Sequence, residues 1–208
     1  MHCHRTPARI VPVSEVGEIG FSVAAVEPVS VETARSYTHS AEEDDAILET
    51  CIKSARVACE NYTGRTYAKR TLELRWAELG SVLNVARGPL GSITAFGYVN
   101  TSGAEVLFAA DSYSIEGQMA HSTTIRFRES FAQPSDIATD RSSPIFLRGV
   151  FGPDAEKVGP IPADVVQAIL WTAAHYFENR SPVVTGTIAT ELPNGIQNIL
   201  WQYRQNPV

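Results

Sequence analysis

The stretch SAEEDDAILETCIKSARVACENYTG, residues 40–64, carries the strongest structural signal in the chain. Ser40 and Glu43 have the spacing of a capping box, in which each side chain bonds the backbone N–H of the other residue. Behind them, apolar residues recur at intervals of three and four, which predicts one buried face on a helix of about six turns. Gly64 stands where a residue in the left-handed conformation ends a helix. The predicted buried face consists of Ile47, Leu48, Cys51, Ile52, Ala55, Ala58, Cys59 and Tyr62.

Residues 65–150 follow this helix and have the pattern of β structure. Thr71–Trp76 alternates polar and apolar residues, as does 124–128, which is the period of a strand with one buried face. Asn100–Gly103 lies between two apolar runs and predicts a hairpin connection. We expect five to seven short, mostly antiparallel strands here, with a loose stretch over Ser130–Ser143.

Helical periodicity returns in the last fifty residues. Pro162 suits the first turn of a helix that is predicted over Asp164–Arg180 and stopped by Ser181-Pro182. An extended loop over Val183–Thr190 and a last short helix over Ile196–Tyr203 complete the chain.

Residues 1–29 form an N-terminal arm without periodicity, except for the apolar Phe21–Val26, which could add a strand or pack on a partner. A short helix from Ser30 to about Tyr37 follows. The elements predict an α+β fold: a small helical core, made of the long helix in the N-terminal half and the C-terminal helix, with an inserted, mostly antiparallel β region. The expected division is an arm over 1–29 and one domain over 30–208, which is helical over 30–64, β-rich over 65–150 and helical with a tail over 160–208.

The chain has 208 residues and a mass of 22.6 kDa, which fits one domain or one domain with an extension. Its 17 Lys and Arg against 23 Asp and Glu give a net charge of −6, which argues against a sequence-wide electrostatic grip on nucleic acid. No apolar run approaches the roughly 20 residues that span a bilayer, and Pro12, Glu15 and Glu18 interrupt any signal-peptide core. We therefore expect a soluble protein that is made in the cytoplasm and has no membrane partner.

Motifs of the common enzyme classes are missing from the sequence, including the phosphate-binding loop, the dinucleotide-binding glycines, the nucleophile elbow and the His-Glu-x-x-His zinc motif. His175 and Glu178 lie on neighbouring faces of one predicted helix and could do acid–base work. No nucleophile or oxyanion donor can be placed beside them, so a packing role is favoured. We expect no enzyme, no catalytic residue and no cofactor. The alternatives are a small α+β hydrolase-like enzyme using His175 and Glu178, or a cytoplasmic ligand-binding module with a deep apolar pocket.

Three further clusters have plainer explanations than a metal site or a nucleophile. The acidic Glu42–Asp45 offsets the positive end of a helix dipole, and His2-Cys3-His4 lacks the fourth ligand of a structural zinc site. Cys51 and Cys59 lie on the apolar face, about 12 Å apart along the helix, which is too far for a disulfide. Arg126 and Arg128 share a strand face, where solvation is favoured over a phosphate contact. We expect no metal.

The C-terminal residues Trp201, Tyr203 and Arg204 are of the types enriched at protein interface hot spots. A short terminal segment has little core of its own to fill, so binding a partner and packing on the parent domain are about equally supported.

Three stretches, in this order and spacing, resemble the head–tail connector (adaptor) proteins of tailed bacteriophages and of phage-derived gene transfer agents. They are Glu60-Asn61-Tyr62-Thr63-Gly64-Arg65, then Ile161–Leu170 continuing to His175–Arg180, then Leu192-Pro193-Asn194-Gly195-Ile196 with Leu200 and Tyr203-Arg204. The resemblance covers roughly residues 28–206, and the chain departs from the short members of the family in its arm and in its long β-rich middle.

The resemblance implies a structural role without catalysis. Such adaptors form a ring of about a dozen copies under the portal protein, extend the DNA channel and dock the stopper or tail-completion protein. DNA then passes without sequence-specific binding, and the protein is made in the bacterial cytoplasm but works at the head–tail interface of the virion or gene transfer agent particle. The C-terminal segment is expected to bind the portal through Leu192, Ile196, Leu200, Trp201, Tyr203 and Arg204.

Overall fold

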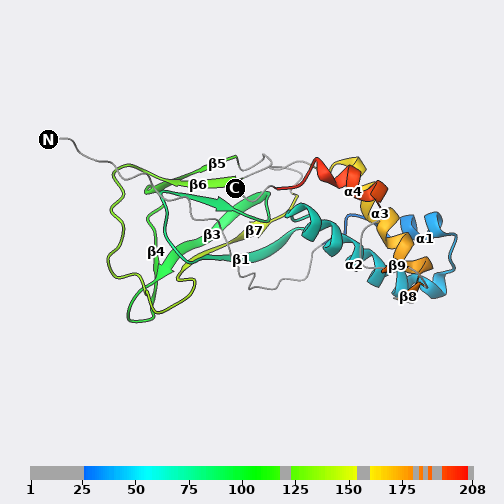
Figure 1. Ribbon diagram of the computed structural model, residues 1–208, viewed down its shortest axis with the longest axis horizontal. Helices are drawn as coiled ribbons and strands as arrows, with labels where there is room; N and C mark the ends of the chain where they lie inside the picture. The colour runs from blue at the N-terminus through cyan, green and yellow to red at the C-terminus, as the bar shows by residue number, and fades with distance from the viewer. Residues whose placement is uncertain are drawn as a thin grey trace.

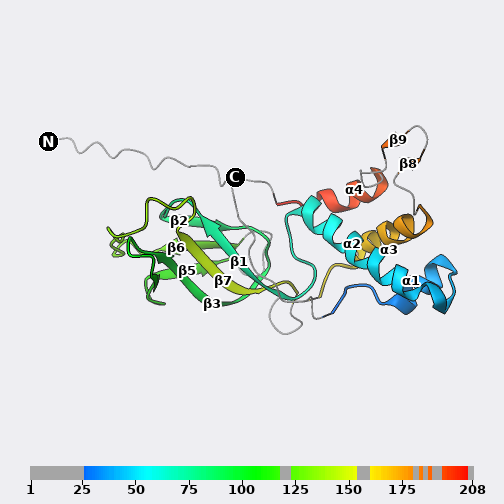
Figure 2. The ribbon, with the colours of Figure 1, turned by 90° about the horizontal axis from the view of Figure 1, so that it is seen from below.

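Two structural parts follow one another along the long axis of the molecule (Figure 1). The computed structural model describes residues 26–117, 123–153, 160–179, 183–184, 187–188 and 194–205. The helices lie at one end and the two larger sheets at the other (Figure 2). We call residues 26–64 and 160–205 the helical part and residues 65–153 the β part. Because the chain leaves the helical part and later returns to it, the expected α+β fold with an inserted antiparallel β region is confirmed.

Four α-helices and one helical turn make up the helical part as far as it is described: α1 (Val31–Thr38), η1 (Glu42–Asp44), α2 (Asp45–Thr63), α3 (Ala163–Glu178) and α4 (Asn194–Trp201). They agree with the helices predicted from periodicity, with the ends of α1, α3 and α4 shifted by one or two residues. Helix α3 contacts the other three and shares one aliphatic core with them. None of the described helices combines the length and apolar character needed to cross a bilayer.

The predicted capping box at Ser40 and Glu43 is wrong. The turn η1 comes first, α2 begins only at Asp45, and neither element has a side-chain cap. The Ser40 hydroxyl bonds that of Thr38 (3.0 Å), while Arg35 of α1 holds the Asp45 carboxylate in a two-pronged contact. This contact between α1 and α2 ties down the start of α2 in place of a cap. The other end is as predicted, because Gly64 has a φ of 72° and caps the helix.

The predicted apolar face of α2 is buried at its centre, where Leu48, Ile52, Ala55 and Cys59 are each at most 1% exposed. Ile47 in the first turn stays 39% exposed. The chain before α1 also joins this core through Val29, which is 3% exposed. Residues 1–25 of the predicted arm lie outside the described residues.

Two antiparallel sheets form the β part. The four-stranded sheet has the order β1 (Arg70–Trp76), β7 (Ile145–Phe151), β3 (Leu90–Val99), β4 (Glu105–Leu107), and the three-stranded sheet has the order β2 (Val82–Val85), β6 (Thr123–Phe127), β5 (Tyr113–Glu116). The seven strands described for 65–153 agree with the expected five to seven, and all are paired antiparallel. Between the sheets lies a second core that is rich in aromatic rings. The rings that contact one another there are those of Phe96, Phe108, Tyr113, Phe127 and Phe131.

The predicted hairpin at Asn100–Gly103 is confirmed. The Asn100 Oδ1 atom accepts hydrogen bonds from the backbone N–H groups of Ser102 (3.1 Å) and Ala104 (2.9 Å), and Gly103 takes a φ of 84°. The stretch Ser130–Ser143 is loose as expected, with one isolated bridge at Ile137. In the predicted loop after α3, the described residues form the short antiparallel pair β8 (Val183–Val184) and β9 (Thr187–Ile188).

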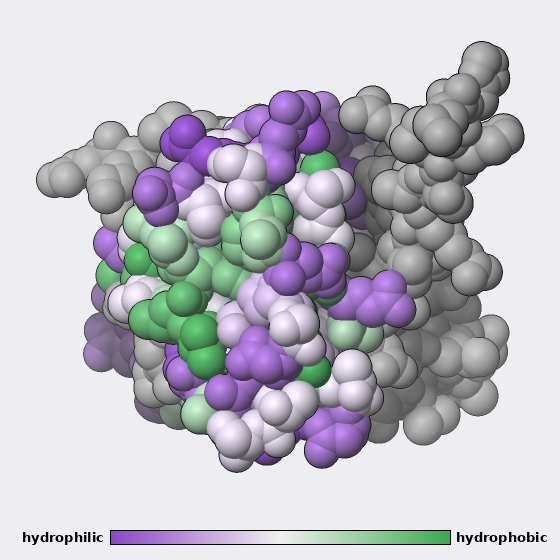
Figure 3. Space-filling model, turned by 90° about the vertical axis from the view of Figure 1, so that its left-hand side faces the viewer, coloured by the Kyte–Doolittle hydropathy of each residue, from purple (hydrophilic) through white to green (hydrophobic). Residues whose placement is uncertain are grey.

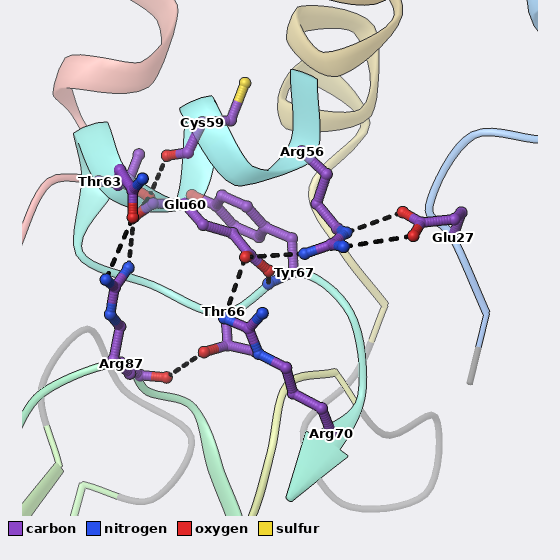
Figure 4. A network of polar contacts seen from close by, with 10 residues as sticks. Glu27, Arg56, Cys59, Glu60, Thr63, Thr66, Tyr67, Arg70 and Arg87 are labelled. Atoms are coloured by element: carbon purple, nitrogen blue, oxygen red, sulfur yellow. Dashed lines mark hydrogen bonds and ion pairs between the residues drawn. The ribbon is translucent and has the colours of Figure 1, made fainter. Parts of the chain in front are cut away.

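Glu60 of α2 lies buried where the helical part meets the β part (Figure 4). Its Oε2 atom accepts a hydrogen bond from Arg56 (2.9 Å) and pairs with Arg70 of β1 (3.1 Å), while its Oε1 atom accepts from the backbone N–H of Tyr67 (2.8 Å). Arg56 also pairs with Glu27 (2.8 Å). One buried carboxylate therefore joins α2, the linker into the β part, the first strand and the segment that precedes α1.

Candidate partner-binding surface

The six residues expected to bind a partner differ widely in exposure. Leu192 lies outside the described residues. Ile196 and Leu200 are 4% and 0% exposed and belong to the core of the helical part. Trp201, in contrast, is 62% exposed at the end of α4. In this conformation Ile196 and Leu200 hold α4 on α3, and among the described residues of this set Trp201 and Arg204 are the exposed ones.

Tyr203 fixes the path of the chain after α4. Its hydroxyl donates to the Asp164 carboxylate of α3, with 2.8 Å to each oxygen, and Gln202 donates to the same group (2.9 Å). Burial, together with this hydrogen bond, raises the pKa of Tyr203. Two residues on, the backbone N–H of Gln205 donates to the carbonyl of Thr63 (2.7 Å). The tail is thus held on both sides of Arg204, whose own side chain is exposed.

Arg204 bridges the last turns of two helices. Its guanidinium carbon lies 5.7 Å from the ring centre of Tyr62 on α2 and 5.5 Å from that of Trp201 on α4. Such stacking on aromatic faces orients a guanidinium while its N–H groups remain available at the edge. Arg204 has no carboxylate partner within the described part of the chain. We call Tyr62, Trp201 and Arg204 the aromatic–arginine seam.

Two further arginines lie beside the seam at the C-terminal end of α2. Arg87 donates to the Glu60 carbonyl (3.4 Å) and to the Asn61 side chain (3.1 Å), and Arg65 lies over the Tyr203 ring at 5.9 Å. The carbonyl end of a helix favours such cations. The Glu60 carboxylate is paired with Arg56 and Arg70, and Asp164 keeps its negative charge while it accepts from the neutral Tyr203 and Gln202. Three arginines, Arg65, Arg87 and Arg204, thus gather at this end of the helical part, on a chain whose net charge is −6.

Sequence reasoning found Trp201, Tyr203 and Arg204 from their residue types but did not connect them with Tyr62 or Asp164. Tyr62 was assigned to the apolar face of α2, and Asp164 was seen only as part of a helix start. Both belong to the surface because α4 places its C-terminal end against the end of α2 and the start of α3. No sequence pattern signals a contact between segments about 140 residues apart.

The end of the β part that lies away from the helices carries an apolar surface patch. Figure 3 views that end and shows apolar residues gathered in its middle, bordered by hydrophilic ones. Large apolar side chains exposed in the β part include Leu107 of β4, at 61%, and Val82 of β2, at 37%.

The other candidates form no reactive constellation in the described residues. His175 faces the side chain of Asn179 (3.2 Å) and has no hydrogen bond to Glu178. Cys51 and Cys59 are buried free thiols, and burial raises the pKa of Cys59 to about 12, which opposes a thiolate nucleophile. Arg126 pairs with Glu116 (3.0 Å).

The acidic Glu42–Asp45 is engaged through Asp45, which pairs with Arg35. Within the described ranges, no group of three or more His, Cys, Asp or Glu side chains is placed to hold a metal ion. His2-Cys3-His4 lies outside those ranges.

The comparisons with known proteins match folds and not sequences. No protein-family model matches the chain, and no curated protein matches it. Among solved structures, a chain in the neck of an empty GTA particle, computed with C6 symmetry, aligns with a TM-score of 0.72 at 18% identity, over 92% of this chain and 97% of that one. A chain in the virion of a native gene transfer agent (GTA) particle gives 0.68 at 22% identity, over 92% and 96%. A chain in the neck of a native GTA particle, computed with C12 symmetry, gives 0.68 at 20% identity, over 94% and 97%. The helical part and the β part together therefore have the fold of chains from gene transfer agent particles.

Proposed function

We propose that this chain is a structural head–tail adaptor of a tailed bacteriophage or gene transfer agent particle. The observation that carries the proposal is the extent of the likeness, because it covers nearly the whole of this chain and of the neck chains, the β insertion included. A neck component works by binding other components, so the adaptor has no reaction to catalyse. Its place is the head–tail interface of the particle.

The adaptor acts as a ring. About a dozen copies, joined head to tail by a rotation that closes, form a collar under the portal protein and extend the DNA channel. The six-fold and twelve-fold symmetries of the two neck structures support such a ring. The net charge of −6 supports a conduit through which DNA passes without being gripped or read.

The portal protein binds the C-terminal segment, within one connector domain over 30–208 that follows an N-terminal arm. Of the six residues assigned to this contact, Ile196 and Leu200 hold α4 in place, and Tyr203 fixes the tail through Asp164. Trp201 and Arg204 supply the exposed chemistry, and Leu192 precedes α4 in the same segment.

The stopper or tail-completion protein binds the ring on the side away from the portal. The apolar patch at the far end of the β part supports this assignment, because such patches on soluble proteins often mark interaction sites.

Deleting the gene in the producing bacterium tests the proposal. We expect DNA-filled heads without attached tails, seen by electron microscopy, because the collar that receives the tail is missing. Supplying the wild-type chain in trans should restore complete particles, and cryo-electron microscopy should then locate it as a ring below the portal. Complete, infectious or transfer-competent particles from the deletion strain would overturn the proposal.

A further inference from the structure

The aromatic–arginine seam holds a cationic group in a fixed position without a partner of its own. Arg204 is exposed, is stacked between Tyr62 and Trp201, and has no carboxylate partner among the described residues. Its backbone cannot swing away, because the Tyr203 hydroxyl and the Gln205 N–H anchor the residues on either side. A guanidinium that is already oriented loses less conformational entropy when it binds than a freely rotating one.

Trp201 adds an apolar surface next to that charge. At 62% exposure, it is the most exposed aromatic residue in the described part of the chain. A planar guanidinium beside an open indole face is the combination found at the centre of protein interfaces, where a carboxylate pairs with the arginine and an apolar side chain covers the ring.

The charges around the seam favour an acidic partner. Arg65 and Arg87 lie beside it at the carbonyl end of α2, Glu60 is paired with Arg56 and Arg70, and Asp164 adds one negative charge next to these arginines. A basic segment would be repelled here, and a neutral one would leave Arg204 without a counter-charge. The same seam of a second copy would be repelled, because its tail and α2 end carry the same cations.

We propose that the seam, made jointly by α2 and α4, is the site that receives an acidic segment of the portal protein, with an Asp or Glu carboxylate on Arg204 and an apolar side chain on Trp201. This inference rests on the proposed adaptor function and deepens it in two ways. It makes Tyr62, on a helix distant in sequence, part of the portal site, and it assigns a negative charge to the portal segment that docks there.

The first experiment measures binding of the purified full-length chain to the purified portal ring of the same particle. We expect Arg204→Glu to weaken binding about 30-fold, as for a hot-spot residue, and Trp201→Ala to weaken it by a similar factor. Arg204→Lys should bind with intermediate strength, because it keeps the charge but loses the planar fork. The matched control is Arg128→Glu, the same charge change at an exposed arginine after β6, which should bind as wild type does. Circular dichroism checks that all variants are folded.

A charge exchange then identifies the carboxylate. In the Arg204→Glu background, surface Asp and Glu residues of the portal are reversed one at a time to Arg, and we expect one reversal to restore most of the lost affinity. If Arg204→Glu binds as wild type does, or if no reversal restores binding, the inference is wrong while the adaptor function stands.

A peptide probe separates this inference from the adaptor function. In a Trp171→Phe background, the buried Trp76 and the exposed Trp201 remain, and a change in emission reports on Trp201 if the additional Trp201→Phe substitution abolishes it. The emission should change when a synthetic peptide of alternating Glu and Leu is added, and should not change with the Gln and Leu counterpart. If the wild-type chain fails to bind the portal but the acidic peptide still shifts Trp201 emission, the adaptor function fails and the acid-binding site remains. A response to both peptides or to neither overturns the site.

A short DNA duplex tests the other possible ligand of the seam. If the duplex binds the wild type, and Arg204→Glu abolishes this binding but leaves portal binding unchanged, the seam is a nucleic-acid site and the inference is overturned.

Discussion

The helical part and the β part are stabilised by hydrophobic cores of different composition. The core of the helical part is mainly aliphatic, with Ala, Val, Ile, Leu and Cys side chains, whereas the core of the β part is built around a cluster of aromatic rings. The two segments of the helical part, residues 26–64 and 160–205, contain eleven Asp and Glu against five Lys and Arg, whereas residues 65–153 contain eight against nine. The β part is close to neutral and the helical part is strongly acidic.

The two parts also differ in how their charges are paired. On the four-stranded sheet, Arg148 of β7 reaches Glu73 of β1 (2.5 Å) and grips Glu105 of β4 with two bonds (2.6 and 2.8 Å). In the helical part, Arg204 is left at the surface beside Trp201. Both parts also hold ion pairs of their own, such as Arg56 with Glu27 and Glu60 in the helical part. What sets Arg204 apart is its place between two aromatic rings, which is why the proposed portal contact is assigned to it.

The largest effect is expected where the two parts meet. Glu60→Gln removes the only charge that faces both Arg56 and Arg70 in the described junction, and breaking a buried pair in this way costs about 4 kcal/mol. Urea unfolding should show the loss, and the two parts should then unfold in separate transitions. Glu49→Gln is the control, because its pair with Lys53 is exposed and contributes about 0.5 kcal/mol or less. A Glu60→Gln protein as stable as wild type would mean that the junction does not couple the parts.

The next effect tests whether the two cores are independent. Leu200→Ala in the helical part and Ile125→Ala in the β part each empty a fully buried site and should cost about 3 kcal/mol. Hydrogen exchange should show faster local opening only in the part that carries the substitution. Equal loss of protection in both parts from either variant would show that the molecule opens as one unit.

A smaller effect, confined to the β part, is expected from Gly97→Ala. A Cβ atom at this position would lie 2.1 Å from the carbonyl oxygen of Val106, so β3 and β4 must move apart. We expect a loss of about 2 kcal/mol by urea unfolding, with unchanged portal binding. Gly195→Ala is the control, because a Cβ there meets no atom within 4 Å. Weakened portal binding by Gly97→Ala would contradict the assignment of binding to the helical part.

The smallest effect concerns acid stability. The hydrogen bonds from Arg148 hold the pKa of Glu105 below its usual value. Because the folded-state pKa is lowered, the stabilisation is present above the unfolded-state pKa of about 4.3 and is lost as the pH falls through the lower folded-state value. Between pH 5 and pH 3, the free energy of unfolding of wild type should fall further than that of Glu105→Gln. The difference should be less than about 1 kcal/mol, because the pair is partly exposed. Urea midpoints across this range measure the difference, with Glu129→Gln as a variant that should follow wild type.

Much of the fold could be predicted from sequence because its signals are local. Gly64 ends α2, Ser30 caps α1, and Asn100 organises the β3–β4 hairpin, each through contacts within a few residues. The capping box failed because α2 begins only at Asp45, whose carboxylate is held by Arg35, ten residues earlier in the chain. The burial of Arg56 and Glu60 escaped prediction for a similar reason, since their partners Glu27 and Arg70 come from other elements.

The candidate site, too, could be predicted only in part from the sequence. Residue type alone pointed to Trp201 and Arg204, whose exposure the structure shows. Apolar periodicity could not tell whether Ile196 and Leu200 face a partner or their own core, because either environment favours the same residues. Only the packing of α4 against α3 decides that they are buried.

The position of the insertion has a consequence for how this fold can vary. Helix α2 ends at Thr63 and α3 starts at Ala163, and both ends are tied to the same tail, through Gln205 and Tyr203. The chain therefore enters and leaves the β part at points that lie close together on the helical part. In the proposed adaptor, the β part can be lengthened, shortened or exchanged between these two points, provided that the Glu60–Arg70 contact is kept, while the C-terminal segment proposed to bind the portal stays unchanged.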